Sequence, residues 1–310
     1  DRYYALQTTA GKYTTQLSST APAGFASSLL CTSTSAFSVG AGDIFGFAQK
    51  VEAYNTSDLM WGTASAKTVT LSFQVYSSLT GTFGGAIQNG AQNYSYPFTY
   101  SIPVANTWTQ ISITIAGPTA GTWISNTNGV GLLVFLSIGT GTTNSGTAGA
   151  WTGTGFYSAT GATSVVGTNG ATFYITGVQL EVGSTATSFD YRPYGTELML
   201  CQRYCYKYCG SGLYEPTGFN GVASSATRVY TTFNTPTQMR ATPTISFSTL
   251  RIDDWSNGYT LTAMALDASS SGKVVIAYAD IGSSSLTQYR YYSIIANNST
   301  SAYSILSAEL

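Results

Sequence analysis

The sequence contains no histidine among its 310 residues, and only 8% of its residues are charged. Without imidazole the chain lacks the commonest general base, nucleophile activator and neutral metal ligand, which excludes Ser/His/Asp and Cys/His catalysis and most catalytic zinc sites. The formal net charge is −1 with no basic cluster, so the attraction that dominates nucleic-acid binding is missing. We therefore expect no catalytic residue, no cofactor, no metal and no nucleic-acid partner.

Long apolar runs and cysteines are also scarce. No apolar run reaches the roughly 18 residues that a membrane-spanning helix needs, and the chain start has no signal-peptide pattern. The four cysteines include three crowded between residues 201 and 209, which does not resemble a disulfide framework. We expect reduced thiols, no membrane insertion, and folding in a cytoplasm.

What the sequence does contain is β-strand pattern. Residues 67–76 read KTVTLSFQVY, in which apolar side chains alternate with polar ones, as in a sheet with one buried face. Residues 172–182 alternate in the same way, but the phase slips at Gly177, which predicts a β-bulge. Further strands are predicted at 108–115, 130–138, 228–233, 244–247, 259–266, 273–281, 289–296 and 303–306.

One segment, residues 196–209, departs from this pattern. It lacks Gly and Pro, begins with the capping residue Thr196 and is followed by Gly210, which predicts an amphipathic helix. Three cysteines on one helical face could hold a metal only with a fourth ligand, so we interpret the stripe as packing. The predicted helix interface consists of Leu198, Cys201, Cys205 and Tyr208, with Cys209 as an alternative to Tyr208.

These patterns together predict an all-β protein with two domains. We expect a jelly-roll β-sandwich over residues 1–194, one short linking α-helix over 195–210, and a smaller C-terminal antiparallel β-domain over 211–310.

Residues 173–204, FYITGVQLEVGSTATSFDYRPYGTELMLCQRY, resemble a sequence common in tail-fibre and other virion appendage proteins of tailed bacteriophages. In that family a jelly roll similar to carbohydrate-binding modules ends in such a strand, turn and helix. Residues 1–3 (DRY) and the Trp108 hairpin resemble the same jelly roll, and MRATPT at 239–244 and ILSAEL at 305–310 resemble its companion C-terminal domain. Cys205 and Cys209 depart from the aromatic or polar residues usual there.

The resemblance implies a non-enzymatic virion structural protein, a tail fibre or similar appendage assembled in the host cytoplasm. It would contribute to host attachment through oligomeric β-domains, most simply homotrimers, with other virion proteins and host surface polysaccharide as partners. The alternatives are a capsid decoration or head-fibre protein that stabilises the shell, and a glycan-degrading depolymerase. A depolymerase needs two opposed carboxylates, whereas Asp253 and Asp254 are adjacent and favour a turn.

The candidate contact residues are aromatic. Tyr94, Tyr96, Phe98 and Tyr100 alternate along the chain, so on a strand they would share one face. Exposed, they would form a stacking platform for sugar rings; buried, they would belong to the core or to a subunit interface. Tryptophans in turn-like contexts could rim a groove: Trp61, Trp123 and Trp151.

Overall fold

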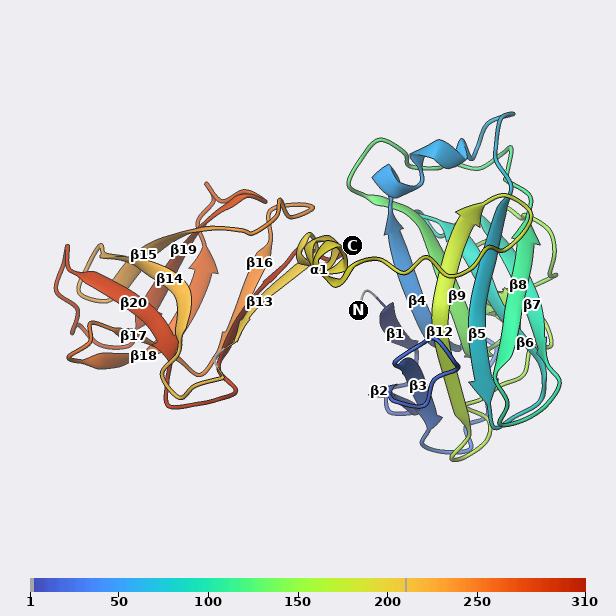
Figure 1. The fold of residues 1–310 in the computed structure, drawn as a ribbon, viewed down its shortest axis with the longest axis horizontal. Coiled ribbons are helices and arrows are strands. Elements are labelled where there is room, and N and C mark those ends of the chain that lie inside the picture. Colours follow the sequence, from blue (N-terminus) through green and yellow to red (C-terminus); the bar gives the residue numbers. More distant parts are fainter. Residues whose placement is uncertain (1–2, 210) are drawn as a thin grey trace. The chain divides into compact units, whose positions relative to one another are not determined.

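The computed structural model describes residues 3–209 and 211–310, except for the side chain of Cys209. The chain forms two compact units, the first running up to Tyr191 and the second covering Arg192–Glu309 (Figure 1). The regular secondary structure of the described residues is almost all β-strand, with one α-helix, which confirms the all-β prediction. No helix among them is long and apolar enough to cross a membrane.

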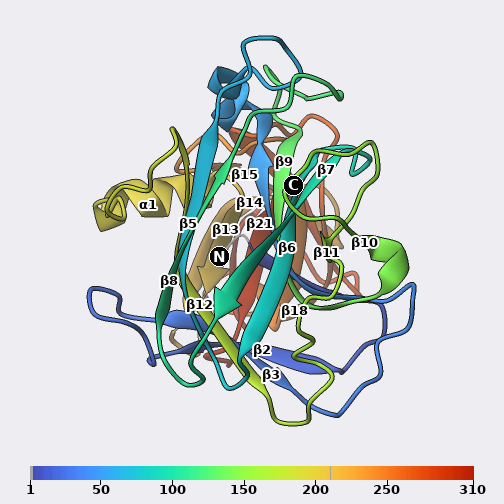
Figure 2. The same ribbon diagram turned by 90° about the vertical axis from the view of Figure 1, so that its right-hand side faces the viewer.

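The first unit is a jelly-roll β-sandwich of two five-stranded antiparallel sheets, named here the β9 sheet and the β5 sheet. Figure 2 shows β5, β8 and β12 on one side of this unit and β6, β7 and β9 on the other. The β9 sheet has the order β1 (Tyr3–Gln7), β4 (Ile44–Glu52), β9 (Val130–Thr140), β6 (Gly81–Asn89), β7 (Ser95–Ile102). The β5 sheet has the order β2 (Tyr13–Ser18), β3 (Ser28–Ser33), β12 (Thr172–Val182), β5 (Val69–Ser77), β8 (Thr109–Ile115).

The core of the first unit fills the space between these sheets. The alternating residues Val69, Leu71, Phe73 and Val75 of β5 are completely buried there, as the period-two pattern predicts. Full burial of each such side chain stabilises the fold by about 1.5–3 kcal/mol. The opposite face of β5 carries polar side chains, of which Thr70 and Ser72 are also buried and Gln74 is half-buried.

The outer face of the β9 sheet is covered by the segment between β9 and β12. This segment holds the short elements η3 (Thr142–Asn144), β10 (Ser145–Gly146) and β11 (Ser158–Ala159). The rings of Tyr157 and Phe135 lie 5.2 Å apart, and Phe135 is fully buried. Two further short helices, η1 (Ala53–Asn55) and η2 (Ser57–Leu59), follow β4.

The second unit consists of a closed six-stranded barrel and a three-stranded sheet, which together bury an apolar core around Phe219, Val229 and Tyr292. The barrel order is β14 (Pro216–Ala223), β15 (Arg228–Asn234), β19 (Val274–Ile281), β18 (Gly258–Leu266), β17 (Leu250–Asp253), β20 (Tyr291–Ala296). The sheet order is β13 (Cys205–Cys209), β21 (Tyr303–Ser307), β16 (Thr244–Ser248).

The predicted helix is shorter than expected. Helix α1 spans Tyr194–Gln202, and Cys205–Cys209 is strand β13, paired with β21. Tyr206 and Tyr208 pack against the barrel core while the intervening Lys207 is exposed, so the alternation of aromatic residues overrides helix propensity. The prediction of a helix over 195–210 was thus wrong for its second half, after Gln202, and Gly210 lies outside the described residues.

This correction also separates the predicted helix interface. Leu198 and Cys201 lie on α1, whereas Cys205 and Tyr208 lie on β13, so the four residues do not share a helical face. None of the residues of α1 is buried. The side chain of Cys209 is not among those described, and the described residues contain no group of three or more Cys, Asp or Glu residues placed to hold a metal.

Candidate functional site

Two of the four alternating aromatic residues belong to the core. Phe98 and Tyr100 on β7 are only 2% and 6% exposed, and the Tyr100 ring lies 5.1 Å from that of Phe73 across the sandwich. Burial also raises the pKa of the Tyr100 hydroxyl. These two residues therefore follow the core alternative and offer nothing to a ligand.

The other two, Tyr94 and Tyr96, are half-buried; Tyr94 contacts both Trp123 and Trp151, and Tyr96 contacts Trp151. We call Trp61, Trp123, Trp151, Tyr94 and Tyr96 the tryptophan cluster. The ring centroids of Trp61 lie 4.8 Å from those of Trp123 and 5.4 Å from those of Trp151, with the planes nearly perpendicular. The structure thus brings together residues that the sequence singled out separately.

The hydrogen bonds of the tryptophan cluster show that it ties loops together. Each indole N–H donates to a main-chain carbonyl, so no indole donor is left for a ligand. The rings also cover one another edge to face, which leaves little open ring surface. The three bonds are Trp61 Nε1 to Lys67 O (2.8 Å), Trp123 Nε1 to Ala120 O (3.1 Å) and Trp151 Nε1 to Ala116 O (2.7 Å).

An aromatic row lies on the outer face of the β5 sheet. Tyr174 on β12 pairs directly with Tyr76 on β5, and Trp108, which immediately precedes β8, continues the row. The ring of Tyr76 lies 5.0 Å from that of Tyr174 and 5.5 Å from that of Trp108. All three are half-buried, so each keeps some ring surface exposed. We call these three residues the aromatic row.

A row of amides and hydroxyls lies beside the aromatic row. Gln74 pairs with Thr176 on one side and with Gln110 on the other, and its side-chain amide donates to the Gln110 carbonyl oxygen. The next residues on the same face, Ser72 and Ser112, carry hydroxyls and also pair. These five residues and the aromatic row carry no formal charge.

Beside these rows, two phenylalanine rings, Phe25 and Phe189, pack at the β-bulge formed at Gly177. The register between β12 and β5 shifts between Thr176 and Gln179, and Gly177 has a φ of +62°, which confirms the predicted bulge. The Phe25 ring covers this glycine so closely that a Cβ there would lie 2.6 Å from Phe25 Cζ. Phe25 in turn contacts Phe189 at 5.2 Å between ring centroids.

The segment that carries Phe189 is held by a carboxylate. Thr187 donates to Glu181 through both its main-chain N–H and its hydroxyl, each at 2.6 Å. These hydrogen bonds from Thr187 lower the pKa of Glu181, so the carboxylate stays ionised in its anchoring role. The main-chain N–H of Asp190 also donates to Gln179 Oε1 at 2.9 Å. These hydrogen bonds therefore hold in place the segment that carries Phe189.

Of the adjacent acids, Asp253 ends strand β17 and Asp254 begins the turn to β18. Asp254 Oδ1 accepts the main-chain N–H groups of Ser256 (3.0 Å) and Asn257 (2.7 Å), and its other oxygen lies 3.1 Å from Arg290 NH2. Asp253 is ion-paired with Arg251. Both carboxylates are thus committed to structure.

The sequence predictions missed the aromatic row, although a signal was present. Tyr76 stands in the polar phase of the alternating strand at 67–76, and Tyr174 stands between the buried Phe173 and Ile175. An aromatic residue in the solvent phase of an alternating strand marks an exposed ring. What the sequence alone could not give is the register that aligns three such rings.

Neither a scan of protein families nor a search of curated proteins finds a match. Among solved structures, the enzymatically active domain of tailspike protein 4 of bacteriophage CBA120 is similar at 13% identity and a TM-score of 0.36, over 59% of this chain and 19% of that one. The C-terminal family 22 carbohydrate binding module of Clostridium thermocellum Xyn10B is similar at 14% identity and a TM-score of 0.33, over 60% of this chain and 89% of that one. A family 11 carbohydrate-binding module from Clostridium thermocellum, in complex with a mixed-linked tetrasaccharide, is similar at 9% identity and a TM-score of 0.31. The match covers 60% of this chain and 91% of that one.

Proposed function

We propose that the first unit binds neutral glycans on the outer face of the β5 sheet. The observation that carries this proposal is the aromatic row of Tyr76, Trp108 and Tyr174 lying beside the amides of Gln74 and Gln110. The apolar C–H faces of a sugar ring stack on aromatic rings, and its hydroxyls exchange hydrogen bonds with amides, which both donate and accept. The lack of charge on these rows favours neutral rather than ionic ligands.

We further propose that the chain is a non-enzymatic, homotrimeric part of a bacteriophage virion appendage, in which this face contributes to attachment to host surface polysaccharide. The resemblance of residues 173–204 and 239–244 to tail-fibre proteins supports the assignment to an appendage. A capsid decoration or head-fibre role is the alternative location for the same chain, and either location is compatible with a sugar-binding face.

The test is isothermal titration calorimetry of the full chain against a panel of neutral linear tetrasaccharides. Trp108→Ala should weaken binding by at least about tenfold, which corresponds to about 1.4 kcal/mol, because central aromatic side chains dominate binding sites. Tyr76→Ala should act in the same direction. Tyr54→Ala is the matched control, because Tyr54 is an exposed aromatic residue of the same unit outside the aromatic row.

Unchanged affinity in both Trp108→Ala and Tyr76→Ala would refute the role of this face. Thermal melts of each variant exclude unfolding as the cause of lost binding. If affinity fell instead in Trp151→Ala with an unchanged melting temperature, the tryptophan cluster would be the binding site.

A further inference from the structure

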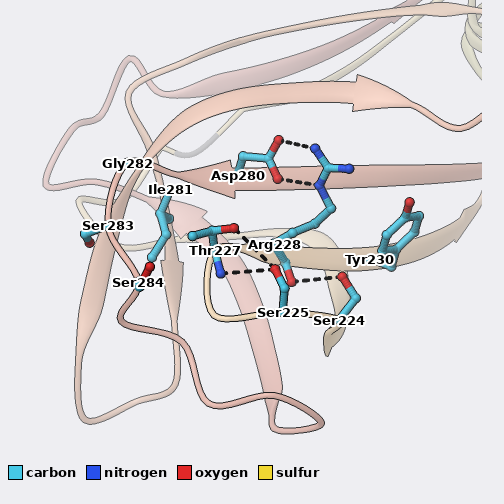
Figure 3. Close-up of a pocket in the computed structure, with 10 residues that line it drawn as sticks. All are labelled: Ser224, Ser225, Thr227, Arg228, Tyr230, Asp280, Ile281, Gly282, Ser283 and Ser284. Atoms are coloured by element: carbon cyan, nitrogen blue, oxygen red, sulfur yellow. Dashed lines mark hydrogen bonds and ion pairs between the residues drawn. The ribbon is translucent and has the colours of Figure 1, made fainter.

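The barrel of the second unit carries a hollow of about 540 Å³ on its outer surface (Figure 3). It lies at the start of β15 and the end of β19. The loop that joins β14 to β15 and the loop that follows β19 lie beside it. Its lining combines one ion pair, one tyrosine and a rim of hydroxyls. The residues that line it include Arg228, Asp280, Tyr230, Ser224, Ser225 and Thr227.

A planar ion pair forms one side of the hollow. Arg228 and Asp280 are directly paired across β15 and β19, and Arg228 Nε and NH2 donate to the two carboxylate oxygens at 2.6 and 2.7 Å. The guanidinium carbon lies 4.2 Å from the centre of the Tyr278 ring. The hydrogen bonds from Arg228 to Asp280 raise the pKa of Arg228, and the opposite charges of the ion pair neutralise each other.

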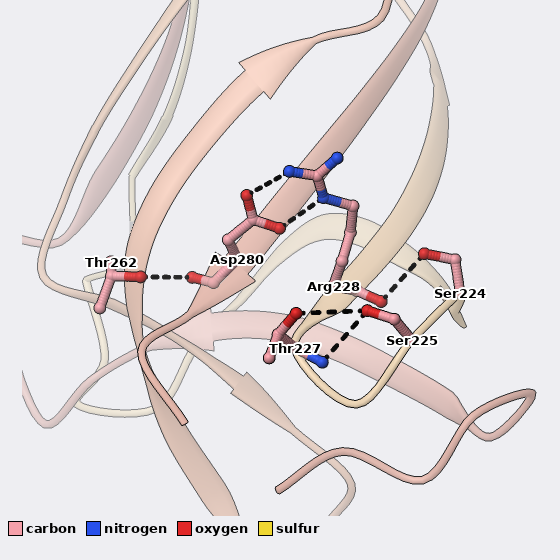
Figure 4. Close-up of polar contacts among 6 residues, drawn as sticks. All are labelled: Ser224, Ser225, Thr227, Arg228, Thr262 and Asp280. Atoms are coloured by element: carbon pink, nitrogen blue, oxygen red, sulfur yellow. Dashed lines mark hydrogen bonds and ion pairs between the residues drawn. The ribbon is translucent and has the colours of Figure 1, made fainter. Parts of the chain in front are cut away.

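Hydroxyls line the adjacent loop (Figure 4). The hydroxyls of Ser225 and Thr227 lie 3.2 Å apart, and the Thr227 main-chain N–H donates to Ser225 Oγ. Ser224 Oγ donates to the main-chain oxygen of Arg228 at 3.4 Å, and the Asp280 main-chain oxygen accepts from Thr262. The loop is thereby fixed at the edge of the ion pair, with serine hydroxyls at the surface.

An apolar row crosses the barrel beside the hollow. Tyr230 is 38% exposed, and its ring lies 5.9 Å from that of Tyr278. The strand register continues this row to Val222 on β14 and then to Tyr291 on β20, and both of these side chains are exposed. Ring faces, a fixed donor–acceptor pair and hydroxyls therefore meet at one place.

We infer that this hollow is a second binding site for neutral sugars, independent of the β5 sheet. The carboxylate of Asp280 can accept from sugar hydroxyls while the guanidinium of Arg228 donates to them, because such charged groups keep further hydrogen-bonding capacity after pairing. The Tyr230 ring supplies a stacking surface. Phosphates and acidic sugars are disfavoured because Asp280 already neutralises Arg228, and cations are disfavoured because Arg228 neutralises Asp280.

The experiment uses the full chain in four forms: unsubstituted, Trp108→Ala, Tyr230→Ala, and both substitutions together. Saturation-transfer NMR and calorimetry are run with neutral linear tetrasaccharides and with a uronic-acid tetrasaccharide. The Trp108→Ala protein should retain binding at one site per chain. Adding Tyr230→Ala to it should reduce the remaining affinity at least tenfold. The uronic-acid probe should bind at least tenfold more weakly than the neutral ones.

A second variant guards against trivial unfolding. Asp280→Asn keeps the size of the side chain but loses the charged acceptor, and it should also lower the affinity of the Trp108→Ala protein for the neutral probes. Trp255→Ala is the matched control, because Trp255 is a 70% exposed aromatic residue of the same unit outside the hollow. Melting temperatures verify that each variant is folded.

The outcomes separate this inference from the function proposed for the first unit. If Trp108→Ala alone abolishes all binding, the barrel site is refuted and the β5-sheet site stands. If binding resists Trp108→Ala but falls in Tyr230→Ala, the barrel site stands and the β5-sheet site is refuted. If Tyr230→Ala and Asp280→Asn both leave affinity unchanged in the Trp108→Ala background, the barrel site is refuted.

Discussion

Cys31 illustrates how burial determines the chemistry of a single residue in this protein. The thiol on β3 is completely buried in the sandwich core, and desolvation raises its pKa to about 12 from 9.0. The thiolate is the reactive form of cysteine, so Cys31 is expected to be inert in the folded chain. Cys201 is half-buried and Cys205 is exposed, so these two thiols differ from Cys31 in access.

We predict that iodoacetamide modifies Cys201 and Cys205 in the native protein but modifies Cys31 only after denaturation. Desolvation also raises the pKa of Cys205, so the reaction is run at a pH above the ordinary thiol value of about 8.5. Mass spectrometry of tryptic peptides with and without guanidinium measures this directly. Modification of Cys31 in the native protein at the rate seen for Cys205 would contradict the buried position.

The same shift predicts a pH dependence of stability. The folded-state pKa of Cys31 is raised above its unfolded value, so its contribution is complete below a pH of about 9 and is lost as the pH rises towards about 12. Burial raises the pKa of Tyr13 and Tyr100 as well, which acts in the same direction. The free energy of unfolding measured in urea should therefore fall above pH 9, and Cys31→Val should make that fall shallower.

At the scale of the element, the bulge of β12 depends on the glycine at position 177. Gly177→Ala forces a Cβ onto a left-handed residue and against the Phe25 ring. We expect it to lower the free energy of unfolding by about 1–3 kcal/mol, measured by denaturant titration. Gly170→Ala is the control, because Gly170 has a φ of +73° but nothing within 4 Å of a Cβ, so it reports the backbone strain alone. Equal costs for the two variants would contradict the role of Phe25.

Alternation in the sequence predicted the strands that bury one face, such as β5 and β8, because side-chain period is a local property. The alternation pattern did not predict strands that contain glycine at positions where a neighbouring strand leaves no room for a side chain. Asn220-Gly221 resembles a hairpin turn, yet both residues lie inside β14, because a Cβ on Gly221 would collide with the main-chain oxygen of Tyr230 on the neighbouring strand. Strand β6 contains the pair Gly84 and Gly85 and was missed for the same reason.

The candidate site was even less accessible to sequence reasoning. The tryptophans at 61, 123 and 151 were selected from their turn-like contexts, but their hydrogen bonds to main-chain carbonyls can be seen only in the folded chain. The pairing of Tyr76 with Tyr174 joins strands almost 100 positions apart, and the pairing of Arg228 with Asp280 joins β15 to β19. Residues so distant in sequence align only through strand register.

At the scale of the whole molecule, the low charge content determines how the surface can be used. With 8% charged residues and a net charge of −1, copies of the chain repel one another weakly. Large apolar side chains are nevertheless exposed on both units, including Leu17 and Tyr54 on the first and Trp255, Tyr289 and Tyr291 on the second. Burial of such side chains between copies of the chain would favour association.

We therefore predict that the chain forms the proposed homotrimer in solution, with a mass by light scattering of three times its 32.6 kDa. Because apolar burial rather than ion pairing would hold the copies together, the mass should not change between about 0.1 M and about 1 M salt, a range over which surface charge pairs are screened. Dissociation on raising the salt would show that charge holds the copies together. A mass of 32.6 kDa at every concentration would refute the trimer and leave each chain to bind glycans as a monomer.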